Sequence, residues 1–131
     1  MLTKSASPAI ITDHVDGSRY FYQKYLGAQL VFDCGWFINL EFTEGLSVQF
    51  MAPQEGMTVC DTRGLTYNFA VENVDAEHAR LLELGLKPQS SPEDHPWGDR
   101  GFTIVDPSGV DLYIYTDIEP SAEFKAAFLK K

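Results

Sequence analysis

The segment GFTIVDPSGVDLYIY, from Gly101 to Tyr115, contains the features that decide the fold. GFTIVD is rich in strand-forming residues, and VDLYIY alternates apolar and polar residues, which is typical of a strand with one buried face. Between them, DPSG has Asp at the first, Pro at the second and Gly at the fourth position, as a type I turn prefers. The segment therefore predicts a β-hairpin, in which we assign Asp106 and Gly109 a structural role.

This hairpin closes the second of two similar halves. In the first half, a strand at SPAIIT precedes a helix ending at Gly27 and three β-rich runs, AQLVFDC, WFINLEF and LSVQFMA. In the second half, a strand at LTYNFAV precedes a helix ending at Gly85, an extended piece at LKPQS and the hairpin. The two helix-ending glycines are 58 residues apart, and the opening strands at Ser7 and Thr66 are 59 apart. This near-constant offset predicts a duplicated βαβββ module.

The predicted domain is a single α+β unit covering residues 1–131. We place module one at about 5–53 and module two at about 65–117. The sequence QEGMTVCDTRG, residues 54–64, has two glycines and no periodicity, which favours a linker. A C-terminal helix is predicted at about 119–130, with Phe124, Ala127 and Phe128 on an apolar face that needs a partner.

Composition restricts the possible partners. The chain of 131 residues has 19 acidic and 10 basic residues, a formal charge of -9. This charge disfavours nucleic acids and anionic membranes and weakly favours cationic or neutral ligands, although an acidic surface more often serves solubility alone. Cys34 and Cys60 are too few for a disulfide framework or a thiolate zinc site. With no signal-peptide pattern or membrane-length apolar run, we expect a cytoplasmic protein.

Three motifs resemble those of a known family. The run SRYFYQKYLG (18–27) is similar to its helix signature, VDPSGVDLYIY (105–115) to its Asp-Pro-x-Gly turn and last strand, and PWGDRGF (96–102) to a segment of its bleomycin-resistance branch. Over residues 7–116 the chain resembles the vicinal oxygen chelate superfamily, which includes glyoxalase I, extradiol dioxygenases, fosfomycin-resistance enzymes and bleomycin-resistance proteins. The resemblance implies paired βαβββ modules forming a cupped mixed sheet, commonly in homodimers.

Metal-dependent members of that family place ligands on the first and last strands of each module. The resemblance assigns those positions to Ser7, Gln49, Thr66 and Tyr113. Hydroxyl groups, an amide and a phenol are poor ligands for a divalent metal, and His14, His78 and His95 lack the spacing of a metal site. We therefore predict no metal, no cofactor and no catalytic residue. These residues favour a protein without enzymatic activity, and they leave open whether the chain is an enzyme.

Strand alternation leaves hydroxyl and amide groups on an aromatic background, which suits flat, partly polar ligands. Trp97, between Pro96 and Gly98, is predicted to stack on the ligand as a lid. Trp36 and Phe37 suit core or dimer packing as well as they suit contact with a ligand. A pair between Asp99 and Arg100 is favoured over ligand recognition by Arg100. The candidate ligand-binding residues are Trp36, Phe37, Asn39, Ser47, Gln49, Thr66, Asn68, His95, Trp97, Arg100, Phe102, Tyr113 and Tyr115.

The resemblance, together with these features, implies a metal-free binding protein of the bleomycin-resistance type, which would confer antibiotic resistance by sequestering an aromatic or cationic compound. A homodimer is the expected assembly. Two alternatives remain open. One is a lyase, isomerase or dioxygenase of the same fold, with His95 or Glu41 as an acid–base group. The other is a regulatory interaction module that uses the C-terminal helix.

Overall fold

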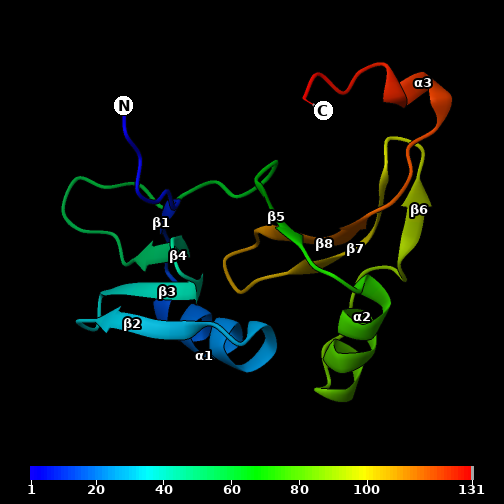
Figure 1. The fold of residues 1–131 in the computed structure, drawn as a ribbon. Helices are drawn as coiled ribbons and strands as arrows, with labels where there is room; N and C mark the ends of the chain where they lie inside the picture. The colour runs from blue at the N-terminus through cyan, green and yellow to red at the C-terminus, as the bar shows by residue number, and fades with distance from the viewer. Residues whose placement is uncertain (131) are drawn as a thin grey trace. The chain divides into compact units, whose positions relative to one another are not determined.

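The computed structural model describes residues 1–130 and divides them into two compact units. Unit 1 comprises Met1–Arg63 with Asp106–Gly109, and unit 2 comprises residues 64–105 and 110–130. Each unit has its own four-stranded mixed sheet and a helix that joins the first strand to the second (Figure 1). The predicted α+β fold of tandem βαβββ modules is confirmed.

Unit 1 contains the first module. Its elements are β1 (Ala9–Ile11), α1 (Val15–Leu26), β2 (Gln29–Asp33), β3 (Phe37–Thr43) and β4 (Leu46–Met51). The strand order is β1-β4-β3-β2, in which β1 is parallel to β4 and the other neighbours are antiparallel. A helical connection returns the chain from β1 to the far edge of the sheet, so the first strand can lie beside the last.

Unit 2 repeats this plan and adds a short helix. Its elements are β5 (Thr66–Ala70), α2 (Val74–Glu83), β6 (Glu93–His95), β7 (Asp99–Val105), β8 (Asp111–Asp117) and α3 (Ala122–Lys125). The strand order is β5-β8-β7-β6, again with a parallel pair, β5 and β8, at one edge. The same topology in both units agrees with the duplication that the sequence predicts.

Local sequence explains the ends of the two long helices. Gly27 follows α1 in the left-handed conformation, at φ 65°, which a glycine adopts without steric cost. At the start of α2, the Asn73 side chain accepts a hydrogen bond from the Ala76 amide. Because these signals act within one helical turn, they can be predicted from the sequence.

Each sheet buries one face under its helix, and the alternating residues of the strands supply the core. The buried apolar residues of unit 1 are Ile10, Val15, Phe21, Tyr22, Ala28, Ile38, Leu40, Val48 and Phe50. Those of unit 2 are Val74, Leu81, Phe102, Ile104, Val110, Leu112 and Ile114. The opposite sheet faces carry the polar and aromatic side chains from which a site can be built.

The DPSG turn packs within unit 1. The Gly109 amide donates to the Asp106 carbonyl oxygen at 3.0 Å, as expected for the predicted turn. The Asp106 carboxylate accepts from the Tyr22 hydroxyl at 2.7 Å and from the Ser108 amide at 2.8 Å. Tyr22 is fully buried and Asp106 is only 4% exposed. The structural role assigned to this turn therefore extends to a buried polar contact with α1.

Two elements differ from the sequence-based expectation. The LKPQS segment is irregular, and the edge strand β6 begins later, at Glu93, so that His95 lies on a strand. The C-terminal helix is four residues long rather than extending over 119–130. A short helix depends on packing for its stability, and Phe124 supplies a ring contact, with Trp97. Within residues 1–130, no helix has the length and hydropathy needed to span a membrane.

Candidate functional site

The open face of the unit 2 sheet gathers polar and aromatic side chains from three strands. Tyr113, Tyr115 and Asp117 alternate along β8 and so point to the same face. The strand register places Asn68 of β5 beside Tyr113 and Asp99 of β7 beside Asp117. Residues that are distant in sequence are thus neighbours on one surface.

Asp99 is the centre of a hydrogen-bond network on this face. Its Oδ1 atom accepts from the Tyr113 hydroxyl at 2.5 Å and lies 2.9 Å from His95 Nδ1. Its Oδ2 atom accepts from Trp97 Nε1 at 2.6 Å. The His95 and Trp97 rings also stack, with centroids 4.5 Å apart and an interplanar angle of 5°. One carboxylate therefore fixes the positions of three aromatic side chains.

A glycine makes room for this arrangement. Tyr113 is opposite Thr103 in the register, but its ring lies across Gly101 to reach Asp99. A Cβ atom at Gly101 would lie 2.5 Å from the Tyr113 hydroxyl oxygen, which is far closer than any real contact. The absence of a side chain at Gly101 is thus a condition for the contact between Tyr113 and Asp99.

The network affects the pKa values of its members in opposite directions. Partial burial acts to raise the pKa of Asp99, but hydrogen bonds from Tyr113, His95 and Trp97 outweigh it, so the net pKa is lowered. Burial first, and then the bond to the Asp99 carboxylate, raise the pKa of Tyr113 well above its ordinary value. At neutral pH the pair is therefore a carboxylate and a neutral phenol.

Next to the network is a pocket of about 410 Å³. Its aromatic lining is Trp97, Tyr113, Tyr115 and Phe128, and its polar lining is Asn68, Asp99 and Asp117, with Gly98. Trp97 is 49% exposed and Phe128 is 55% exposed, so part of each ring is available to a ligand. The Tyr113 and Tyr115 rings lie nearly parallel, 5.7 Å apart. Such a lining suits a flat molecule that stacks on the rings and accepts or donates a few hydrogen bonds.

The C-terminal segment is attached to the loop that carries Trp97. The Ile118 amide donates to the Gly98 carbonyl oxygen at 2.9 Å, and the Ser121 amide to that of Pro96 at 2.8 Å. A Cβ atom at Gly98 would lie 3.3 Å from the Ile118 carbonyl oxygen, and φ is 113° there, so glycine suits this position. These bonds hold the C-terminal segment beside the Trp97 loop, and Phe128 of this segment lines the pocket.

Of the predicted ligand-binding residues in unit 2, Asn68, His95, Trp97, Tyr113 and Tyr115 belong to the network or the pocket. Three others do not. Thr66 is opposite Asp111, farther along the sheet. Phe102 is 1% exposed and contacts His78 in the core.

Arg100 is the third. Its guanidinium is bound by Asp75 at 2.9 and 3.0 Å and by Asp94 at 3.0 Å. The expected pair between Asp99 and Arg100 is therefore wrong. Neighbouring residues on a strand point to opposite faces, and this separates the two side chains. Arg100 instead links the start of α2 to β6.

The predicted residues of unit 1 are more dispersed. Ser7 and Gln49 share a hydrogen bond of 3.1 Å, and Asn39 is opposite Gln49 in the register. Ser47 lies two residues before Gln49 on the same strand, while Trp36 and Phe37 contact each other edge to face, with ring centroids 6.1 Å apart. These residues are on the open face or at its edge, but they do not line a described pocket.

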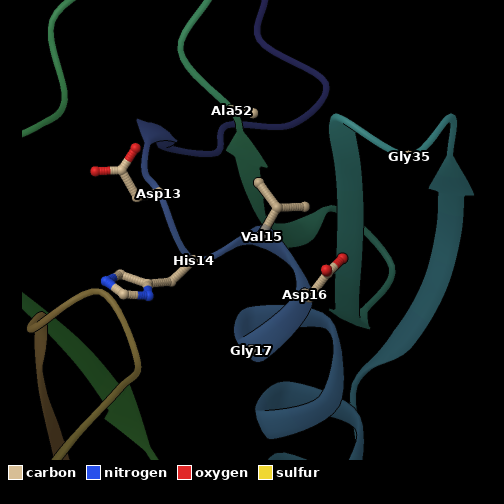
Figure 2. Close-up of a pocket in the computed structure, with 7 residues that line it drawn as sticks. All are labelled: Asp13, His14, Val15, Asp16, Gly17, Gly35 and Ala52. Atoms are coloured by element: carbon tan, nitrogen blue, oxygen red, sulfur yellow. The ribbon is translucent and has the colours of Figure 1, made fainter.

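A second pocket, of about 370 Å³, lies at the start of α1. Asp13, His14 and Asp16 line it, and their side chains point in different directions (Figure 2). Asp16 is bound to Arg19 at 2.6 Å. The polar groups do not converge on a common point, and none of the predicted ligand-binding residues lines this pocket.

The four positions that the family resemblance assigns to metal ligands are equivalent in the two units. Gln49 is in register with Ala9, two residues after Ser7, and Tyr113 is in register with Asn68, two residues after Thr66. Their chemistry does not fit a divalent metal, because the Gln49 amide bonds to Ser7 and the Tyr113 phenol bonds to Asp99. Residues 1–130 contain no group of three or more His, Cys, Asp and Glu side chains that could hold a metal ion.

Sequence reasoning missed four of the residues that line the pocket: Gly98, Asp99, Asp117 and Phe128. Asp117 could have been found by extending the alternation of Tyr113 and Tyr115 by one step. Asp99 carried a weaker signal, because only His95 and Trp97 are near it in sequence, whereas Tyr113 reaches it from β8. Phe128 had no usable signal, since the predicted long helix does not form.

Comparison with known proteins agrees with this fold. The model of the glyoxalase/bleomycin resistance protein/dioxygenase superfamily matches residues 4–114. A member of that superfamily from Nocardioides has a TM-score of 0.77 at 20% identity, over 91% of this chain and 85% of the other. No curated protein matches the chain.

Two further structures with the same fold have different descriptions. TnmS3 from Streptomyces sp. CB03234, an antibiotic-binding protein, has a TM-score of 0.71 at 20% identity, over 88% of this chain and 97% of the other. A lactoylglutathione lyase from Agrobacterium tumefaciens has a TM-score of 0.70 at 17% identity, over 88% of this chain and 96% of the other. At these identities the likeness shows the fold alone.

Proposed function

This chain belongs to the glyoxalase/bleomycin resistance protein/dioxygenase superfamily, and we propose that it is a metal-free protein that sequesters a small aromatic or cationic compound. The observation that carries the proposal is the network in which Asp99 holds Trp97, His95 and Tyr113 beside an aromatic pocket. Rings fixed before binding lose little conformational freedom when a ligand stacks on them, and this favours affinity.

The proposal that no metal takes part rests on side-chain chemistry. Ser7 and Gln49 are bonded to each other, and Tyr113 is a neutral phenol bonded to Asp99. If the protein binds its ligand without a metal, treatment with a chelator leaves the affinity unchanged. Stoichiometric zinc, nickel, iron or manganese with His or Glu ligands would contradict this part of the proposal.

A panel of flat compounds tests sequestration directly. Cationic, neutral and anionic three-ring aromatics are titrated into the protein while tryptophan fluorescence is followed, since a stacked ring changes the emission of an exposed indole. At least one member is expected to alter the emission in a saturable way and to be recovered chemically unchanged. If no member of the panel binds, the proposed function is wrong.

Trp97→Ala separates binding from folding. Because the indole is 49% exposed, its removal is expected to lower the affinity of any bound panel member about tenfold and to change the melting temperature little. Trp97→Phe is the matched control, which keeps an aromatic ring but loses the hydrogen bond to Asp99. A large stability loss in Trp97→Ala would identify Trp97 as a folding residue.

One observation favours a second candidate function, a lyase, isomerase or dioxygenase of the same fold. His95 Nδ1 lies 2.9 Å from Asp99, and a carboxylate that orients an imidazole is a common arrangement in general acid–base catalysis. Mass spectrometry after incubation with the panel tests this alternative. Conversion of a compound by the wild-type protein, abolished in His95→Gln, would replace sequestration by catalysis.

A homodimer is part of the proposal. On unit 1, Phe32 is 52% exposed and Trp36 is 48% exposed, and both rings contact Phe37. A cluster of exposed aromatic rings supports a protein–protein contact. Analytical ultracentrifugation is expected to give the mass of a dimer for the wild-type chain and a shift toward monomer for Trp36→Ala. A wild-type monomer at all concentrations would contradict this assembly.

A further inference from the structure

The pocket of unit 2 contains two carboxylates whose surroundings differ. Asp99 and Asp117 are directly opposite each other on β7 and β8, and both line the pocket. The Asp99 side chain is only 15% exposed, whereas Asp117 is an exposed residue at the end of β8. Their proximity and different environments suggest separate roles in binding.

The Asp99 carboxylate is largely occupied by its own unit. Oδ1 is in contact with both Tyr113 and His95, and Oδ2 accepts from Trp97. A carboxylate oxygen has about two acceptor positions, so these contacts leave one position at most. Asp99 is therefore a positioning residue, which keeps the Trp97 and Tyr113 rings in place for a ligand.

The Asp117 carboxylate has acceptor capacity to spare. Among residues 1–130, no hydrogen bond or ion pair to its side chain is found. The basic side chains of β7 and α3 are bound elsewhere, since Arg100 is paired with Asp75 and Asp94, and Lys125 with Glu119. Among the residues that the structure describes, no lysine or arginine lines the pocket. The negative charge of Asp117 is thus available to a ligand.

The aromatic lining, like the negative charge of Asp117, favours a cationic ligand. Trp97, Tyr115 and Phe128 present ring faces or edges to the pocket, and the π-system of an aromatic ring attracts a nearby cation. A flat ring system with a protonated nitrogen can stack on these rings while its N–H group donates to Asp117. An anionic ligand would instead face two carboxylates, and no lysine or arginine of residues 1–130 lines the pocket to offset them.

We propose that Asp117 is the specificity-determining residue of this pocket and selects a flat aromatic ligand that carries a protonated nitrogen. The proposal rests on the proposed binding function and assigns its ligand class. The proposal divides the affinity for the ligand into two contributions. The rings that Asp99 positions contribute whatever the charge of the ligand, and Asp117 contributes only when the ligand is a cation.

Two three-ring dyes test the proposal. Proflavine is a cation at neutral pH, and acridone has the same ring frame but is neutral. Both are titrated into wild-type protein, Asp117→Asn and Asp111→Asn, with dye fluorescence as the readout. Asp111→Asn is the matched control, because it removes the same charge from an exposed residue of the same strand. Asp111 does not line the pocket.

The expected result is a preference of wild-type protein for proflavine over acridone by about two- to fivefold, the range of a partly solvated charge contact. Asp117→Asn should remove most of this preference by weakening proflavine alone, and Asp111→Asn should keep it. Asp99→Asn should weaken acridone as well as proflavine, because it releases the rings, and should alter the near-ultraviolet circular dichroism of Trp97.

The outcomes separate this inference from the proposed function. Equal binding of both dyes to wild-type protein, or the same loss in Asp117→Asn and Asp111→Asn, overturns the role of Asp117 and leaves the binding function in place. An effect of Asp99→Asn on proflavine alone overturns the division of roles between the two carboxylates. If neither dye nor any member of the panel binds, the binding function itself fails.

Discussion

Each unit of the molecule contains a hydrogen bond from a tyrosine to an aspartate, and the two bonds have different surroundings. In unit 1, Tyr22 donates to Asp106 at 2.7 Å, and both residues are buried. In unit 2, Tyr113 donates to Asp99 at 2.5 Å on the wall of an open pocket. The same pair of side chains thus stabilises the core in one unit and holds an aromatic ring at an open pocket in the other. Burial, rather than residue type, distinguishes the bond in the core from the bond at the pocket.

The largest effect on folding is expected from Asp106→Ala. It leaves the buried Tyr22 hydroxyl and the Ser108 amide without their acceptor, and such a loss costs about 2–4 kcal/mol in the free energy of unfolding. Urea denaturation measures this cost, with the exposed Asp111→Ala as the control. A cost below about 1 kcal/mol would show that the buried bond contributes little to the stability of unit 1.

Gly101→Ala is expected to have a smaller effect on folding and to disrupt the site. The new methyl group would overlap the Tyr113 ring and press on the Ile114 carbonyl oxygen, 2.8 Å from the Cβ position. Overpacking of this kind costs about 1–3 kcal/mol. The affinity for an aromatic ligand should fall together with the stability, because Tyr113 can no longer reach Asp99.

A double-mutant cycle checks the cause of the Gly101→Ala effect. In a Tyr113→Ala background, the same substitution should cost less, since only the contact with the Ile114 carbonyl oxygen remains. If the cost is equal in both backgrounds, the ring of Tyr113 does not depend on the space over Gly101.

The smallest effect concerns acid stability. The pKa of Asp99 is lowered from its ordinary value of 3.8, so its ionised form stabilises the folded state above that pH. We expect Asp99→Asn to lose about 1 kcal/mol at neutral pH. The difference from wild type should shrink as the pH falls below about 5 and through the lowered folded pKa. Urea denaturation at several pH values measures it, and a difference that grows in acid would contradict the network.

Features set by local chemistry could be predicted from the sequence. The DPSG turn, the glycine that ends α1 and the Asn73 cap of α2 each depend on contacts within a few residues, and all are present. The repeated order of elements then gave the fold. Tyr113 was likewise placed on the open face because alternation along β8 is regular.

The partners that site residues find on distant parts of the chain could not be predicted, because they depend on strand register. Asp99 meets Tyr113 only because that ring crosses Gly101, and Arg100 meets Asp75, which is far away in sequence. The tail shows a similar limit, since an amphipathic pattern predicted a long helix. In the structure the helix ends at Lys125, and Phe128, which follows it, lines the pocket.

The central claim is that the ligand binds in unit 2, and two single-tryptophan variants test it most directly. Trp36→Phe leaves Trp97 as the only indole, and Trp97→Phe leaves Trp36. When a panel compound that binds the wild-type protein is titrated into both, a saturable change in emission is expected with Trp97 as the only indole. Emission from Trp36 should change little. A change confined to Trp36 would place the ligand at unit 1 and contradict this account.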